Sequence, residues 1–140
     1  MTMSTKQAFT LLELTISMAI IAMLVTLAIP QYTHHKAKVH RAEAKLTLLH
    51  LSSRMETYYE THHTYEKAKL QDLIDQTALP DYALSLSNLS PSTYTLLARS
   101  VGRQKNQDPT CAVLVLNQLG EKGIGLNEGR VDIDFNSICW

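Results

Sequence analysis

One long apolar run opens the chain and dominates its hydrophobic pattern. It extends from Phe9 to Ile29 and contains a single charged residue, Glu13. As a helix, this run of about 21 residues would be roughly 30 Å long, which matches the hydrocarbon core of a bilayer. Leu, Met and Ala dominate, no Gly or Pro interrupts the run, and apolar residues occur on every side, so a helix is favoured over a strand. The pattern predicts a membrane-inserted helix over residues 9–30.

A second, amphipathic pattern follows Pro30. Proline lacks a backbone N–H and clashes with the preceding turn, so Pro30 is expected to bend or interrupt the helix. Over 31–60, apolar residues then recur every three or four positions in two sets: Val39, Ala42, Leu46 and Leu49, and Leu48, Leu51, Met55 and Tyr58. We expect one kinked helix from about residue 9 to about residue 59, whose second half offers a face to a small sheet.

Helical periodicity fades between residues 61 and 92. Pro80, Pro91 and several serines in this segment favour a connecting region. One short helical turn is expected within it, near residues 70–74.

The last third of the chain shows the alternation typical of strands. Strands are predicted at 94–101, 112–116 and 131–135, with loops at 102–110 and 120–129. Because consecutive strands with short connections tend to pair with each other, we expect residues 93–140 to form an antiparallel meander. The predicted fold class is therefore α+β: a long kinked helix packed on a small antiparallel sheet.

Length and charge narrow the possible functions. A chain of 140 residues has room for one anchor and one small domain. Its formal net charge is zero, so there is no global positive field of the kind that attracts nucleic acid. A local exception is the group formed by Arg99, Arg103 and Lys105 around one predicted loop. These three residues are candidate DNA contacts of strongly salt-dependent affinity.

The start of the chain resembles a known processing motif. Ala8-Phe-Thr-Leu-Leu-Glu13, followed by an apolar helix that ends at Pro30, is similar to the prepilin motif of type IV pilins and their pseudopilin relatives. The resemblance implies a leader over 1–8, cleavage between Ala8 and Phe9 by prepilin peptidase, and N-methylation of Phe9. It also implies the type IV pilin fold, with the helix kept as membrane anchor and filament core. Ala8 stands where the family usually has Gly.

In such a filament, the Glu13 carboxylate could form an ion pair with the α-amino group of Phe9. A carboxylate in an apolar environment is costly without a partner. Cleavage would create an α-amino group on Phe9, with an unperturbed pKa near 8, which is equally costly there. Their attraction at contact is about 4 kcal/mol for an effective dielectric near 20. The pair can form between neighbouring subunits or within one helix, and the sequence does not choose between them.

The two cysteines, Cys111 and Cys139, both lie in the last third of the chain. A disulfide between them is expected if this region is extracytoplasmic, and closing a loop of about 28 residues would contribute about 3–4 kcal/mol. A count of positive charges opposes that topology, because only Lys6 precedes the apolar run whereas four cations follow it closely. The leader and the cysteine pair outweigh this count. The ending, Cys111 to Gly120 with a terminal Cys139-Trp140, resembles minor pilins of the PilE type, in which the disulfide brackets an exposed C-terminal region.

The resemblance also implies a location and partners. The precursor would cross the inner membrane once, with a periplasmic C-terminal domain, and would move to the cell-surface pilus, or fimbrium, on assembly. Its partners would be the membrane before assembly, the inner-membrane assembly machinery, prepilin peptidase and other pilins in a helical filament. Roles in adhesion, twitching motility or DNA uptake follow from membership of such a pilus.

Catalytic chemistry is not indicated. The six histidines include the adjacent pairs His34-His35 and His62-His63, but neither pair has a second ligand pair at a useful spacing. Asp132 and Asp134 share a strand face, yet too few other oxygen ligands accompany them for calcium. The glycines do not form a nucleotide-binding loop, and no serine or cysteine sits in a nucleophile context. We expect no catalytic residue, no metal and no cofactor.

Three functions remain, of which the first is preferred over the other two. The first is a minor structural subunit of a type IV pilus, which acts by assembly. The second is a DNA-receptor pilin that uses Arg99, Arg103 and Lys105. The third is a type II secretion pseudopilin, which the cysteine pair and the Cys139-Trp140 ending disfavour.

Overall fold

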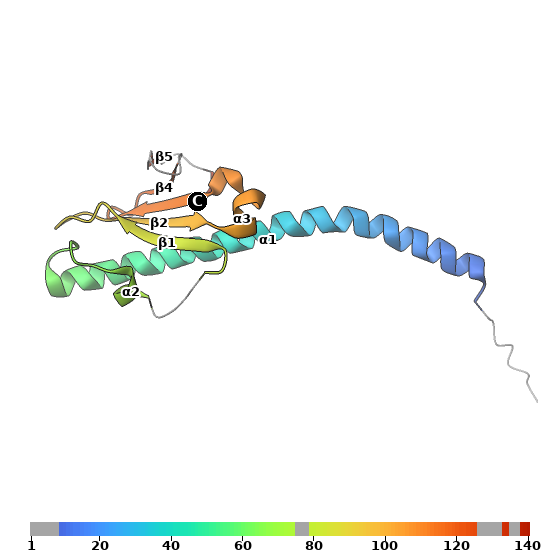
Figure 1. Ribbon diagram of the computed structural model, residues 1–140, viewed down its shortest axis with the longest axis horizontal. Helices are drawn as coiled ribbons and strands as arrows, with labels where there is room; N and C mark the ends of the chain where they lie inside the picture. The colour runs from blue at the N-terminus through green and yellow to red at the C-terminus, as the bar shows by residue number, and fades with distance from the viewer. Residues whose placement is uncertain (1–8, 75–78, 126–132, 135–137) are drawn as a thin grey trace, which may run out of the picture. The chain divides into compact units, whose positions relative to one another are not determined.

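Figure 1 shows the computed structural model of the chain, which describes residues 9–74, 79–125, 133–134 and 138–140. The chain divides into two compact units, the first ending at His35 and the second running from Lys36 to Trp140. We describe each unit separately. The predictions made for residues 1–8, 131, 132 and 135 concern residues outside this described part.

Helix α1 runs from Leu11 to His62 and contains 52 residues. This confirms the predicted long helix. The helical hydrogen-bonding pattern continues through Pro30, so of the two expected effects, a bend or an interruption, the interruption does not occur. The predicted bend at Pro30 stays a prediction. Among the described residues, no helix combines the length and the apolarity that crossing a membrane requires.

The first unit consists of the beginning of α1. The hydroxyl of Thr10 accepts a hydrogen bond from the backbone N–H of Glu13 at 3.3 Å, which caps the start of the helix. Within the helix, the hydroxyls of Thr15 and Ser17 each donate to a carbonyl one turn back, at 2.8 Å. These three hydroxyl groups are thereby hydrogen-bonded within the helix itself.

The sheet of the second unit has five antiparallel strands in the order β1-β2-β3-β4-β5, so the predicted meander is confirmed. The strands are β1 (Tyr82–Ser87), β2 (Thr95–Ser100), β3 (Val113–Asn117), β4 (Lys122–Gly125) and β5 (Ile133–Asp134). Strands β2 and β3 lie at the predicted positions, and β5 falls within the third predicted strand. Helix α2 (Leu70–Leu73) confirms the predicted helical turn.

Three segments differ from the sequence-based prediction. Strand β1 occupies part of the predicted connecting region 61–92, because its serines obscure an alternation in which Tyr82 and Leu84 face the core. Predicted loop 102–110 instead forms helix α3 (Gly102–Gln107) and the 3-10 helix η1 (Pro109–Cys111).

Strand β4 lies in the predicted loop 120–129, where its glycines argued against a strand. The packing against β3 gives a reason for the glycine at position 125. A Cβ at this position would lie 3.0 Å from Cγ1 of Val113, which is too close for ordinary packing. A side chain at this position would therefore require the Val113 side chain to shift.

The core lies between α1 and one face of the sheet, and Figure 1 shows the green part of α1 running along that sheet. From α1 it receives Ala44, Leu48, Leu51 and Met55, and from β2 and β3 it receives Leu96, Ala98, Leu114 and Leu116. Each fully buried leucine contributes about 1.5–3 kcal/mol relative to an exposed one.

The other predicted apolar set of α1 does not face the sheet. Val39, Leu46 and Leu49 are 43%, 67% and 43% exposed. They lie on the side of the helix away from the buried residues, so only one of the two predicted stripes is used for folding.

A disulfide joins Cys111 to Cys139, as predicted. It attaches the last residues of the chain to η1. Next to it, Nε1 of Trp140 donates a hydrogen bond to the carbonyl of Gly123 at 2.7 Å, so the C-terminus is also fixed on β4.

A polar cluster links α1 to the start of β2. The hydroxyls of Tyr65 and Tyr94 donate to the carboxylate of Glu56 at 3.1 and 3.0 Å, and the hydroxyl of Ser52 lies 2.9 Å from that of Tyr94. Burial raises the pKa of Tyr94 to about 12, with the Ser52 hydrogen bond acting against this and Glu56 adding to it. Burial, then Glu56, also raises the pKa of Tyr65 to about 12.

This cluster predicts a loss of stability at high pH. The pKa of the Tyr94 hydroxyl is about 12 in the folded state and near 10 in the unfolded state. Its contribution to the free energy of unfolding is therefore complete below pH 10 and is lost as the pH rises through 12. Urea unfolding of the full-length protein in detergent between pH 9 and 12 should show this decline, and Tyr94→Phe should make it shallower. An equally steep decline in Tyr94→Phe would contradict the assignment.

Candidate nucleic-acid interface

The processing motif lies at the start of the first unit. Phe9 is the first described residue and is 78% exposed, whereas Ala8 lies outside the described residues. Glu13 is the acidic residue in the first turn of α1, where a negative charge is favourable next to the helix N-terminus. The helix therefore begins directly after the predicted cleavage point.

The three predicted DNA contacts lie on one continuous segment but on different surfaces. Arg99 is on β2 opposite Ala83 and Val113, is half-buried, and points to the face of the sheet away from α1, because Ala98 and Ser100 face the other way. Arg103 and Lys105 are exposed on α3. Arg103 and Lys105 lie on either side of the buried Gln104 in α3, so their side chains leave the helix in different directions, whereas Arg99 lies on β2.

Helix α3 is attached to α1 by a buried glutamine. Nε2 of Gln104, which is 1% exposed, donates to the carbonyl of Ala37 at 2.9 Å and to the hydroxyl of Tyr82 at 3.1 Å. In Figure 1, α3 lies at the end of the sheet next to the cyan part of α1. Exposed cations lie on both sides of each residue in this contact. Ala37 lies between Lys36 and Lys38, and Gln104 lies between Arg103 and Lys105.

Arg41 forms a second link between α1 and the C-terminal region. Its Nη1 donates to both carboxylate oxygens of Asp108, at 3.0 and 3.2 Å, and lies 2.7 Å from Sγ of Cys111. Both charged side chains are mostly buried. No local sequence pattern signals this partner, which is 67 residues away in the chain.

Lys45 lies one turn further along α1 and extends this positive region to the sheet. The pKa of Lys45 is lowered, mainly by burial and next by the charge of Arg41. Asp108 acts in the opposite direction, and Lys122 has a smaller lowering effect. Lys122 is on β4 opposite Leu116, and its Nζ lies 5.5 Å from the centre of a Trp140 ring. Arg41, Lys45 and Lys122 therefore form one group of interacting cations.

The other side of α1 has a different charge pattern. Nδ1 of His40 lies 3.1 Å from Asp81 and 3.4 Å from Glu43. Two carboxylates, those of Asp81 and Glu43, thus lie next to the His40 imidazole on this side. The chain has no net charge, but the side of α1 that carries Arg41 and Lys45 is locally positive because these carboxylates lie on the other side.

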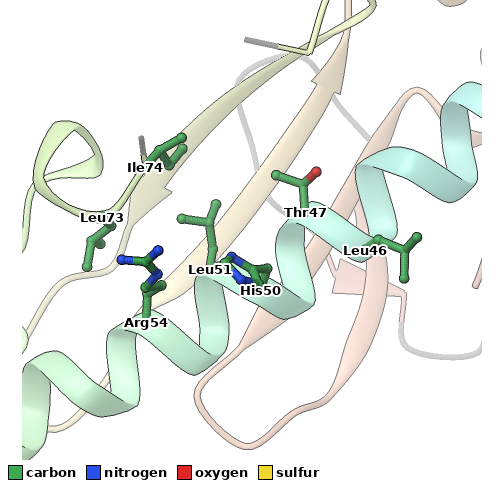
Figure 2. A pocket seen from close by; sticks show the side chains of 7 residues that line it. All are labelled: Leu46, Thr47, His50, Leu51, Arg54, Leu73 and Ile74. Atoms are coloured by element: carbon green, nitrogen blue, oxygen red, sulfur yellow. The ribbon is translucent and has the colours of Figure 1, made fainter. Parts of the chain in front are cut away.

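A groove of about 310 Å³ lies elsewhere in the second unit, between α1 and the segment of α2 (Figure 2). Of the described residues that line it, none is acidic: Leu46, Thr47, His50, Leu51, Arg54, Leu73 and Ile74. In the part of the chain that the structure describes, no group of three or more His, Cys, Asp or Glu is arranged to hold a metal ion.

Comparison with known proteins identifies the family. A family profile described as type IV minor pilin ComP, DNA uptake sequence receptor, matches residues 30–115, which is more than half of the chain. The chain belongs to this family of type IV minor pilins. A second profile, the prokaryotic N-terminal methylation motif, matches residues 3–29 of this minor pilin. Comparison with curated protein sequences gives no match.

The fold of this minor pilin is similar to that of a solved relative. The crystal structure of the non-core minor pilin PilV from Neisseria meningitidis matches with a TM-score of 0.54 and 26% sequence identity, covering 71% of this chain and 98% of that one. The type IV pilin fold expected from the resemblance is thereby confirmed, as is the interpretation as a minor pilin. The family is one of structural pilus subunits.

The Gln104 contact predicts a measurable part of the stability of this region. Gln104→Met keeps the side-chain volume but removes both donated hydrogen bonds, so the free energy of unfolding should fall by about 1–2 kcal/mol. Gln107→Met, at an exposed position of the same helix, should change it by less than about 0.5 kcal/mol. Equal stability of the two variants in urea unfolding would show that Gln104 does not hold α3 in place.

Proposed function

We propose that this minor pilin is a DNA-binding subunit of a type IV pilus, which assembles through its N-terminal helix and presents a cationic surface of its second unit to duplex DNA during uptake. The observation that carries the proposal is the match to a family described as a DNA uptake sequence receptor, because the matched residues 30–115 include most of the cations described above. The geometry favours the DNA-receptor function over a purely structural role.

Assembly is supported by apolar side chains that the fold does not cover. In the first unit Phe9, Leu11 and Met23 are 78%, 82% and 71% exposed, and similar exposure recurs along that segment. Such a surface needs lipid or other helices around it. Before assembly the membrane would cover it, with the second unit in the periplasm. In the pilus on the cell surface, the helices of other pilins would cover it.

Processing and register follow from the same segment. Prepilin peptidase would cleave after Ala8, Phe9 would be N-methylated, and the inner-membrane machinery would add the mature chain to a growing fibre. The Glu13 carboxylate would then pair with the Phe9 amine of a neighbouring subunit. This pairing would offset the cost of two isolated charges in an apolar filament core.

The register proposal is tested by substituting Glu13. Glu13→Gln keeps the shape of the side chain but cannot pair ionically with an amine, so the processed variant should be incorporated into sheared fibres at less than about a tenth of the wild-type level, given the attraction of about 4 kcal/mol estimated above. Glu43→Gln, an exposed substitution later in α1, is the control and should be incorporated normally. The readout is the amount of chain beginning at N-methyl-Phe9, measured by intact mass spectrometry. Normal incorporation of Glu13→Gln would contradict the proposed pairing.

DNA binding is tested with the full-length protein in detergent. Arg103→Ala/Lys105→Ala should weaken binding to duplex DNA about tenfold at 0.1 M salt and reduce the slope of log K against log salt by about 1.8, that is, 0.9 for each lost phosphate contact. Lys67→Ala/Lys69→Ala removes the same charge from exposed positions elsewhere and should leave both quantities nearly unchanged. Failure of the wild type to bind duplex DNA even at 20 mM salt would overturn the proposed function.

A further inference from the structure

One row of cations lies along the edge of α1 that borders the sheet. Lys38, Arg41 and Lys45 are spaced at i, i+3 and i+7, which places them on one side of the helix. Ala44 and Leu48 on the neighbouring face are fully buried, so the row runs beside the core contact. The Arg41–Asp108 ion pair shows that this side faces the end of α3 and the disulfide.

The sheet adds a fourth cation to this row. Lys122 lies at the position opposite Leu116, on the face of the sheet that packs toward α1. It is close enough to Lys45 for the two charges to interact, and this repulsion contributes to the lowered pKa of Lys45. Only one carboxylate, Asp108, acts in the opposite direction, and Arg41 already binds it. Around Lys45, the two neighbouring cations, Arg41 and Lys122, therefore outnumber the one carboxylate, Asp108.

Such an excess is unfavourable for folding. Like charges held near one another destabilise the compact state, and burial of Lys45 adds to the cost. An anion that binds here would remove this cost.

Trp140 fixes the position of the sheet cation. Its indole N–H donates to Gly123, the residue after Lys122, and the adjacent Cys139 is held by the disulfide. The Lys122 ammonium lies 5.5 Å from a ring centre of the indole, within the range of cation–π attraction. Trp140 is the only tryptophan in the chain, so its fluorescence reports on this edge.

The arrangement suits an extended polyanion better than a small anion. The cations come from α1 and β4 and follow an edge, and none of them lines the groove described above. Lys38 and Lys45 are seven residues apart, or about 10 Å along the helix. A phosphodiester backbone offers repeated negative charges over such a length.

We propose that Lys38, Lys45 and Lys122, arranged beside Arg41 and Trp140, contact the phosphate backbone of duplex DNA. The proposal rests on the proposed DNA-receptor function and extends its surface from α3 across α1 to β4. Arg41 is a positioning residue here, because its guanidinium binds Asp108 and joins α1 to the C-terminal region.

The test compares two matched double variants of the full-length protein in detergent. Lys45→Gln/Lys122→Gln should bind a random-sequence 30-base-pair duplex about tenfold more weakly at 0.1 M salt, and its salt slope should fall by about 1.8. Lys67→Gln/Lys69→Gln, with the same change in charge, should retain wild-type affinity and slope. DNA should also change the Trp140 emission of the wild type but not that of Lys45→Gln/Lys122→Gln at the same concentration.

Folding is controlled in two ways. Lys45→Gln should not lower the urea unfolding midpoint, since the charge it removes is disfavoured by burial and by neighbouring cations. Lys45→Arg/Lys122→Arg keeps both charges and should retain DNA affinity within about twofold.

Several results would overturn the inference. If wild type binds DNA and Arg103→Ala/Lys105→Ala weakens it, but Lys45→Gln/Lys122→Gln does not, the proposed function stands and this inference fails. A variant that loses affinity only for mixed micelles containing anionic phospholipid would assign the row to a membrane surface instead. Absence of wild-type DNA binding would overturn both proposals together.

Discussion

The buried face of α1 is the constraint on which the second unit depends. Ala44, Leu48 and Met55 are 0% exposed, and their packing on the sheet fixes the rotation of the helix about its own axis. That rotation determines which other side chains of α1 are exposed and which lie next to the sheet. Val39, Leu46 and Leu49 are left exposed, whereas Arg41 and Lys45 lie on the side of the helix that is near Asp108 and Lys122 of β4, with Lys38 in line with them. Assembly and DNA binding would thus use separate sides of one helix.

Three links at one end of the sheet hold the cationic surface together. Gln104 bonds to the backbone of α1, Arg41 pairs with Asp108, and the disulfide fixes the residues next to Trp140. Each link joins segments that are far apart in the sequence. Because these contacts are mostly buried, the cations of α1, α3 and β4 keep a defined arrangement, which is what recognition of a regular phosphate backbone requires.

Much of the fold could be predicted from the sequence because its signals are local. The long helix, β2, β3 and the short α2 follow from periodicity, and the cysteines indicated their pairing. Strands β1 and β4 were missed because serines and glycines weaken the alternation. The candidate site was predicted only in part: Arg103 and Lys105 lie on α3 as exposed residues, while the alternation in β2 sends Arg99 to the other face of the sheet. The association of Lys45 with Lys122 depends on tertiary packing, which no local pattern reveals.

Lysine footprinting of the full-length protein with and without duplex DNA tests the central claim most directly. Amine-specific labelling followed by mass spectrometry measures the accessibility of each ammonium group separately. The account predicts that DNA protects Lys38, Lys45, Lys105 and Lys122, while Lys67 and Lys69 are labelled equally in both samples. Protection confined to Lys67 and Lys69, or unchanged labelling of all six in a sample that demonstrably contains the complex, would contradict it.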